Sequence, residues 1–275
     1  MCGAVLLFAC LDAMAKWLGG HLHPFQVTGM RYISAFFIAL IFLNPFTRPN
    51  ILKTTQPRMQ FFRGLLMLGT TLLNFLSFRY LQLDEALAIM FSTPFLVAIM
   101  AGPILGEWVG WRRWTAIVVG FIGVLVVIRP GSSVFQPASL LLLGSALCYA
   151  IYQIYIRRLA GIDHPATSIF YSVLLGSIIM SCVVPFVWTT PRNWQHWALF
   201  FSTGAMGALG HYCVARAMTY ASANFIAPFN YTQMIGSVIV GYLMFAEVPD
   251  AYVWLGTTLI VLAGLMVGWS GRKRI

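Results

Sequence analysis

Long apolar runs alternate with short polar breaks along the whole chain. A bilayer core about 30 Å thick is crossed by roughly 20 apolar residues in a helix, and this window predicts ten spans. The predicted spans are residues 2–20, 27–46, 61–80, 85–105, 111–129, 138–157, 167–188, 197–219, 223–245 and 251–270. Because the connections between them are short, we expect the function to reside within the membrane.

The composition agrees with this pattern. Hydrophobic residues make up 60% of the chain and charged residues only 9%, with a mean hydropathy of +0.82. Soluble domains carry roughly 25% charged residues, so the composition excludes a cytosolic enzyme, a secreted disulfide scaffold and a disordered regulator. The sequence therefore predicts an all-α integral membrane protein surrounded by lipid.

Basic residues exceed acidic ones, with 17 Lys and Arg against 7 Asp and Glu. They lie at the ends of apolar runs rather than in one segment, so we predict no nucleic-acid partner. With a cytoplasmic N-terminus, twelve of the 17 lie on the inner side, including Arg63, and five on the outer side, including Arg31. The excess of positive charge inside predicts that both termini are cytoplasmic.

No catalytic residue, metal site or cofactor is predicted. The five cysteines lie in apolar stretches without a C-x-x-C pair. The sequence also lacks a phosphate-binding glycine loop, an H-E-x-x-H motif and a G-x-S-x-G motif. Without a nucleotide-binding module, any pumping by this chain would draw on a solute or ion gradient.

The two halves of the sequence carry similar landmarks in the same order. Residues 78–81 correspond to 218–221 at an offset of 140, and residues 106–107 correspond to 246–247. Each half has five predicted spans, and because five is odd the second half must be inverted in the membrane. The predicted units are a first five-helix repeat (1–131), a linker (132–137) and an inverted five-helix repeat (138–275). Inverted repeats are typical of secondary transporters, whose substrate site lies between the halves.

The chain resembles the drug/metabolite transporter superfamily, and within it the ten-helix EamA-type carriers. The matching residues are Lys16, Pro24, Arg31, Arg79-Tyr80-Leu81, Glu85-Ala86, Pro94, Gly106-Glu107, Ala227-Pro228 and Glu247-Val248-Pro249. One departure is Met234, which stands where the first half has Pro94, so the two halves cannot kink identically. Within the superfamily, the chain is most similar to the exporter branch for aromatic and other amphipathic amino acids. The resemblance implies a multi-pass carrier of the bacterial inner membrane.

The fourth and ninth spans contain the strongest candidates for a substrate site. The candidates there are Met90, Phe91, Ser92 and Pro94, with Pro228, Asn230, Tyr231 and Gln233 in the second half. Prolines break a helix and free backbone carbonyls, which are tolerated at membrane depth where they line a cavity. We expect the freed carbonyls and polar members to bind an amino-acid head, and the aromatic members and Met to face its side chain. The alternative is that the prolines only kink packed helices.

Charged and titratable residues within spans are costly and therefore informative. Asp12 and Lys16 share a helical face at i,i+4 spacing, which fits a structural ion pair. Alternatively, Lys16 contacts a substrate carboxylate or Asp12 takes up a proton. His211, followed by Tyr212, is either a proton relay or a hydrogen-bonded packing residue.

Further candidates for the cavity wall lie in the third and sixth spans. They are Asn74, Phe78, Tyr149, Tyr152 and Gln153, the last three at i, i+3 and i+4 on one helical face. Aromatic faces there could stack on a ring or a cation, and ordinary helix packing is the alternative.

Two G-x-x-x-G pairs, at Gly102 and Gly106 and at Gly264 and Gly268, allow close helix contact. The second pair fits either a homodimer face or an internal contact. The predicted partners are a small-molecule substrate, membrane lipid and, on the first alternative, a second copy of the chain.

We predict alternating-access export of aromatic and other amphipathic amino acids and related small metabolites across the bacterial inner membrane. The first alternative is a carrier of a nucleotide-like or adenosyl metabolite or a cationic drug. A phosphate-bearing ligand should require several inward-facing Lys or Arg residues, and Lys16 is almost alone within the predicted spans. The second alternative, a membrane scaffold or intramembrane enzyme, would not require broken helices at matched positions.

Overall fold

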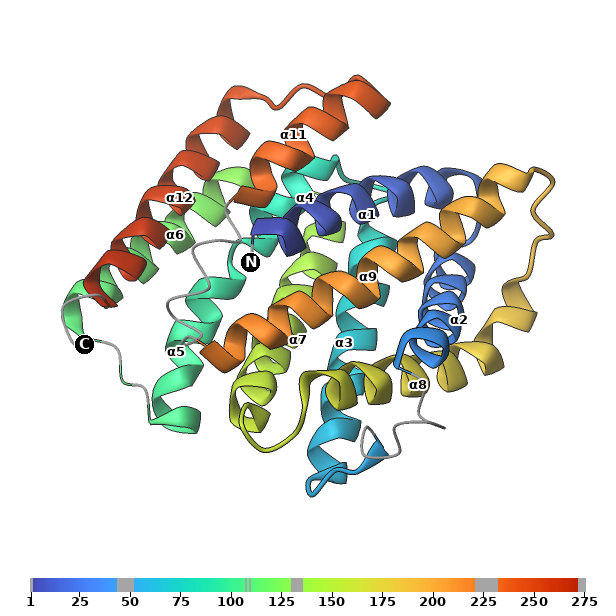
Figure 1. Cartoon of the computed structure of the whole chain (residues 1–275). Helices are drawn as coiled ribbons and strands as arrows, with labels where there is room; N and C mark the ends of the chain where they lie inside the picture. The colour runs from blue at the N-terminus through green and yellow to red at the C-terminus, as the bar shows by residue number, and fades with distance from the viewer. Residues whose placement is uncertain are drawn as a thin grey trace.

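The computed structural model describes residues 2–43, 52–106, 108, 110–129, 136–220 and 232–271. Every regular element of these residues is a helix, as predicted (Figure 1). The helices are α1 (Cys2–His21), α2 (Pro24–Leu43), α3 (Pro57–Ser77), α4 (Leu83–Met90), α5 (Thr93–Leu105), α6 (Trp111–Ile128), α7 (Ala138–Leu159), α8 (Pro165–Val183), the 3-10 helix η2 (Val184–Val187), α9 (Trp194–Tyr220), α11 (Thr232–Phe245) and α12 (Ala251–Gly271).

Each helix overlaps a predicted span, and α4 and α5 share the fourth. Within the described residues, six helical stretches are long and apolar enough to cross a membrane. They are Gly3–His21, Pro24–Leu43, Leu83–Leu105, Ala138–Leu159, Pro165–Val187 and Trp194–Tyr220. The chain is therefore a multi-pass membrane protein, while ten crossings and cytoplasmic termini stay predictions.

The helices pair in a symmetric pattern between the two halves of the chain. The contact between α3 and α7 corresponds to the contact between α9 and α1 in the other half. In the same way, the contact between α3 and α8 corresponds to the contact between α9 and α2. Similarly, α5 packs on α7 and α11 packs on α1. Helices α6 and α12 meet at one side of the bundle, and α2 and α8 meet at the opposite side (Figure 1). A two-fold relation between repeats would produce these paired contacts.

The fourth predicted span is broken beside Pro94. Helix α4 ends at Met90 and α5 begins at Thr93, which places Pro94 in the first turn of α5. Proline has no backbone N–H to donate and fits this first turn better than a helix interior. The Phe95 amide donates to the Ser92 carbonyl at 3.1 Å, so the chain resumes its helix directly after the break.

The bundle is apolar outside and contains charged residues inside. Phe42 and Phe186 are 79% and 88% exposed, as suits side chains that face lipid. In contrast, Arg31 and Arg63 are only 5% and 0% exposed. Both arginines therefore lie inside the bundle, and the membrane sides predicted for them stay predictions. Because α2 begins at Pro24, Arg31 falls well inside that helix.

Candidate functional site

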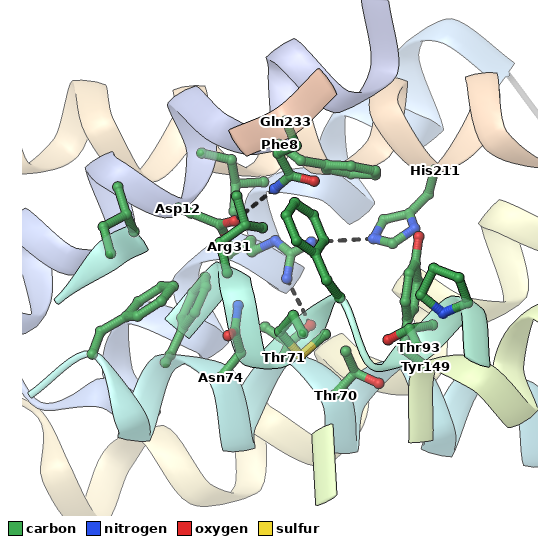
Figure 2. Close-up of a pocket in the computed structure, with 18 residues that line it drawn as sticks. Phe8, Asp12, Arg31, Thr70, Thr71, Asn74, Thr93, Tyr149, His211 and Gln233 are labelled. Carbon is green, nitrogen blue, oxygen red and sulfur yellow. Dashed lines mark hydrogen bonds between the residues drawn. The ribbon is translucent and has the colours of Figure 1, made fainter. Parts of the chain in front are cut away.

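A cavity of about 100 Å³ lies between the two halves of the bundle (Figure 2). Its walls come from α1 to α5 on one side and from α7, α9 and α11 on the other. The lining residues are Phe8, Leu11, Asp12, Arg31, Thr70, Thr71, Asn74, Phe75, Phe78, Leu83, Leu87, Met90, Phe91, Thr93, Pro94, Tyr149, His211 and Gln233. This volume accommodates several water molecules or part of a substrate.

Arg31, from the first half of α2, supplies a buried positive charge to the cavity. Its Nη1 donates to Thr71 Oγ1 at 2.7 Å, and its Nη2 lies 3.5 Å from His211 Nε2. The guanidinium also lies over the Phe75 ring, 5.6 Å from the ring centroid. Contacts from α3 and α9 thus fix the planar fork, a geometry that suits a carboxylate or phosphate.

Asp12, from α1, supplies a negative charge to the same cavity. Its Oδ2 accepts a hydrogen bond from Gln233 Nε2 on α11 at 3.1 Å. The charges of Asp12 and Arg31 attract each other, but the two side chains do not make the direct contact of an ion pair. Figure 2 shows both labelled side chains beside the cavity, each held by a different neighbour.

His211 lies between the cavity and the aromatic residues behind it. Its Nδ1 is 3.4 Å from the Tyr152 hydroxyl, and its ring centroid lies 4.8 Å from that of Phe8. Arg31 can donate to Nε2 while Nδ1–H donates to Tyr152, an arrangement that needs only neutral histidine. The geometry accommodates both predicted roles of His211, the proton relay and the packing residue.

Aromatic side chains form much of the remaining wall. Phe75 on α3 and Phe78, directly after its end, are stacked with their centroids 5.9 Å apart, and Phe91, Tyr149 and Phe8 also line the cavity. Rings at such spacing bind other flat rings by offset stacking or edge contacts, and they attract cations. The wall therefore suits a ligand with an aromatic or heteroaromatic group.

The break between α4 and α5 faces this cavity as well. Phe91, Thr93 and Pro94 all line it. The Thr93 hydroxyl is buried without a hydrogen-bond partner among the described residues. Since buried polar atoms are rarely left unpaired, this hydroxyl is available to a ligand in the cavity.

A second buried arginine, Arg63 on α3, lies outside the cavity. Its Nε donates to Gln60 Oε1 at 3.1 Å and its Nη2 to Ser172 Oγ at 2.7 Å. Gln60 in turn donates to Asp163 Oδ2 at 2.6 Å, and the guanidinium lies 5.5 Å from the Tyr152 ring centroid. Polar groups of α3 and α8, with the residue Asp163 between α7 and α8, thus enclose this charge.

The predicted Asp12–Lys16 pair is wrong. Lys16 instead forms an ion pair with Glu247, which follows α11, and donates to the Leu81 carbonyl at 3.1 Å. Glu247 also accepts a hydrogen bond from the Leu83 amide at 3.1 Å, at the start of α4. The helical turn brings Lys16 to the connections between helices, while Asp12 faces the cavity.

The cavity gathers most of the predicted site residues that the structure describes. They are Asp12, Asn74, Phe78, Met90, Phe91, Pro94, Tyr149, His211 and Gln233. Ser92, Tyr152 and Gln153 are buried outside it, and Tyr212 packs in a separate apolar cluster with Ala35 and Phe170. Pro228, Asn230 and Tyr231 lie outside the described residues.

Sequence reasoning missed Arg31, Thr71 and Phe75 as cavity residues. Arg31 could have been found, because an arginine inside an apolar span is as costly as Asp12 or Lys16. Arg31 lies within the predicted span 27–46, but it was assigned to the outer side of the membrane rather than to the site. Thr71 and Phe75 carry no such signal, since their helix face follows only from the packing of α3.

The sequence is similar to bacterial membrane transporters. The sequence profile of the EamA-like transporter family matches residues 1–129 and 136–269. The chain is 31% identical over 266 residues to the S-adenosylmethionine uptake transporter of Rickettsia felis, covering 95% of this chain and 88% of the relative. It is 29% identical to the riboflavin transporter of Vibrio cholerae, covering 99% and 93%.

A more distant relative is the pseudopaline exporter of Pseudomonas aeruginosa, 26% identical over 94% of this chain and 91% of the relative. One solved crystal structure has a similar fold, with a TM-score of 0.74 and 18% identity. The match covers 98% of this chain and 96% of the other. At that identity the structural likeness concerns the fold alone.

Proposed function

The chain belongs to the EamA-like transporter family, and from this premise we propose that it carries an adenosyl-type metabolite across the bacterial inner membrane. The proposed substrate class is a heteroaromatic ring joined to a short charged chain, as in S-adenosylmethionine. The observation that carries the proposal is the cavity itself, where aromatic rings surround a fixed guanidinium and a carboxylate. The rings suit the heterocycle and the charges suit the chain.

The relatives support this class over general amino-acid export. Their names refer to S-adenosylmethionine, riboflavin and pseudopaline, and two of these three compounds contain a large heteroaromatic ring. The sequence argument against a nucleotide-like ligand was that Lys16 is almost alone within the spans. Among the described residues that line the cavity, Arg31 is the one lysine or arginine, but S-adenosylmethionine carries no phosphate, so that argument does not count against it.

Alternating access by two inverted five-helix repeats is part of the proposal. The symmetric helix contacts and the two matches of the family profile support the division into residues 1–131 and 138–275. In carriers of this kind, one bundle rocks against the other around a fixed site. Net transport then follows the substrate gradient. In this arrangement both termini lie in the cytoplasm.

Counterflow in proteoliposomes tests the substrate class. Vesicles containing the purified full chain would be loaded with one unlabelled compound and then given the labelled compound outside. We expect saturable accumulation of labelled S-adenosylmethionine above that of protein-free vesicles. Counterflow of phenylalanine or riboflavin without counterflow of S-adenosylmethionine would replace the proposal with the corresponding class.

A proline pair in α5 tests the placement of the site. Pro94 lines the cavity, whereas Pro103 lies in the same helix with an exposed side chain away from it. We expect Pro94→Ala to lower counterflow of S-adenosylmethionine while Pro103→Ala retains it, both variants eluting as folded protein. Equal flux in the two variants would contradict the site.

A further inference from the structure

We propose, building on the proposed function, that Arg31 and Asp12 together bind the zwitterionic α-amino-acid head of the substrate. Arg31 binds the carboxylate and Asp12 binds the ammonium group. This assignment makes the two residues the determinants of specificity for ligands that carry both charges on one carbon.

The first observation is that two opposite charges face one cavity without direct contact. Elsewhere in the chain opposite charges do meet, as Lys16 does with Glu247. The charges of Arg31 and Asp12 attract each other, yet the two side chains bind to different helices. Arg31 contacts α3 and α9, and Asp12 contacts α11. A zwitterion placed between them would satisfy both charges at once, which neither achieves alone.

The second observation is the way in which Arg31 is held. Thr71 on α3 and His211 on α9 each occupy one of its terminal nitrogens. A guanidinium has five N–H donors, so these two contacts leave donors for a ligand while they fix the plane of the fork. A fixed fork with free donors is suited to the two oxygens of a carboxylate.

The third observation concerns Asp12, whose two oxygens differ in their surroundings. Oδ2 accepts from Gln233, while no side chain among the described residues donates a hydrogen bond to Oδ1. The carboxylate lines the cavity and is neither fully paired nor fully buried. Oδ1 is therefore the acceptor that an ammonium group would use.

The rest of the cavity determines what can be attached to the head. Beyond the two charges the wall is aromatic and apolar, including the stacked pair Phe75 and Phe78. The class is therefore an α-amino acid whose side chain ends in a ring. S-adenosylmethionine belongs to this class and so does phenylalanine, whereas riboflavin and 5′-methylthioadenosine lack the zwitterion.

Binding competition on the full chain in detergent tests the inference. The probe is radiolabelled S-adenosylmethionine, and the competitors are S-adenosylhomocysteine, the decarboxylated analogue of S-adenosylmethionine and 5′-methylthioadenosine. Charged hydrogen bonds are each worth about 10- to 100-fold in affinity. We expect S-adenosylhomocysteine to compete within about threefold of the probe, and the decarboxylated analogue at least about tenfold more weakly.

Two variants assign each charge to its residue. In Arg31→Gln, loss of the carboxylate from the ligand should no longer weaken binding, so the ratio between S-adenosylmethionine and its decarboxylated analogue should approach one. In Asp12→Asn, loss of the amino group from the ligand should no longer weaken binding, so the ratio between S-adenosylmethionine and its deaminated analogue should approach one. These are ratios measured within one variant, so a general loss of folded protein does not imitate them. Arg79→Gln removes an exposed arginine and should retain the wild-type ratios.

The outcomes separate this inference from the proposed function. Equal affinity of wild type for S-adenosylmethionine and its decarboxylated analogue would overturn the zwitterion site and leave the adenosyl class intact. If the chain binds phenylalanine but not S-adenosylmethionine, the adenosyl class fails. The same ratios, measured with phenylalanine and phenylethylamine, then decide the zwitterion site. Binding of riboflavin alone would overturn both.

Discussion

Arg31 and Arg63 are two buried arginines with similar immediate contacts and different surroundings. Each donates to a hydroxyl at 2.7 Å, and each lies over an aromatic ring at about 5.5 Å. Arg31 opens onto the cavity and faces a carboxylate that it does not touch. Arg63 is enclosed by Gln60, Ser172 and Tyr152, and has no exposed surface.

This difference indicates that the charge of Arg31 serves ligand binding, whereas the charge of Arg63 serves the packing of the bundle. Arg63 is held by the protein through Nε and Nη2, while its buried Nη1 has no hydrogen-bond partner among the described residues, and its removal leaves Gln60 and Ser172 without a donor. Arg31 lines the cavity and Arg63 does not, so removal of Arg31 should affect ligand binding first. Tyr152 connects the two regions, because its ring lies beneath Arg63 and its hydroxyl meets His211 beside Arg31.

The largest expected effect is on stability, from Arg63→Met. The substitution leaves Gln60 Oε1 and Ser172 Oγ without their donor in the interior, and it removes the charge that lies near Asp163. Breaking a buried charged network at one partner costs about 3–5 kcal/mol. We expect the thermal unfolding midpoint in detergent to fall by about 10 °C.

Arg31→Met provides the matched comparison for that experiment. Because Arg31 borders an open cavity, we expect its midpoint to remain much closer to that of wild type while ligand binding is lost. Equal destabilisation by the two substitutions would remove the distinction between the two arginines.

Gly207→Ala should weaken ligand binding by displacing Arg31 without removing it. A Cβ atom at Gly207 would lie 2.9 Å from both Nε and Nη2 of Arg31, so the guanidinium must shift. We expect affinity for S-adenosylmethionine to fall about tenfold, as for the loss of one charged hydrogen bond. Stability should hold or rise slightly, because alanine favours a helix over glycine by about 1 kcal/mol.

Gly144→Ala is the control, since its new Cβ would make only an ordinary contact of 3.4 Å with Leu73. It shares the gain in helix propensity and should retain the wild-type affinity in the same binding assay. A loss of affinity in both variants would indicate an effect of glycine substitution in general rather than of the guanidinium.

The sequence alone predicted the helices better than it predicted the different surroundings of Arg31 and Arg63. Apolar run lengths anticipated the helices, and Pro94 anticipated the break, because both depend on local chemistry. Thr71 and His211, which contact Arg31, and Ser172, which contacts Arg63, lie far from them in the sequence. The order of apolar residues does not encode which helix faces meet, so the sequence could not indicate these partners.

The same limit applies to the charged residues of α1. Spacing alone paired Asp12 with Lys16, since i,i+4 neighbours share a helix face. Tertiary packing supplied better partners, Gln233 for Asp12 and Glu247 for Lys16. Local periodicity therefore indicated which residues matter and could not indicate what they contact.

Removing the hydroxyl acceptor of each arginine should give the same difference between the two sites, with smaller effects on affinity and stability. Thr71→Val keeps the shape of the side chain and removes the acceptor for Arg31, and Ser172→Ala removes the acceptor for Arg63. We expect Thr71→Val to weaken ligand affinity up to about tenfold. Ser172→Ala should instead lower the unfolding midpoint by a few degrees, through about 1–2 kcal/mol. A stability loss from Thr71→Val with unchanged affinity would contradict the binding role of Arg31.

A third arginine, Arg129 at the end of α6, extends the comparison to a partly exposed site. It pairs with Asp250, whose side chain is 47% exposed and whose Oδ1 accepts from the Val253 amide at 2.8 Å at the start of α12. Partial burial raises the pKa of Asp250, but hydrogen bonds from Val253 and Arg129 and the charge of Arg129 outweigh it, so the net pKa is lowered.

Asp250→Asn should have the smallest effect, below about 1 kcal/mol at pH 7, because exposed ion pairs contribute little. Asparagine caps a helix about as well as aspartate, so the substitution removes chiefly the pairing with Arg129. Since the folded pKa is lowered, the stabilisation is present above the ordinary pKa of aspartate and is lost as the pH falls through the folded value. We therefore expect the unfolding midpoints of wild type and variant to differ slightly at pH 7 and to converge near pH 3. A large, pH-independent difference would mean that Arg129, like Arg63, stabilises the fold through its buried contacts rather than through the pairing with Asp250.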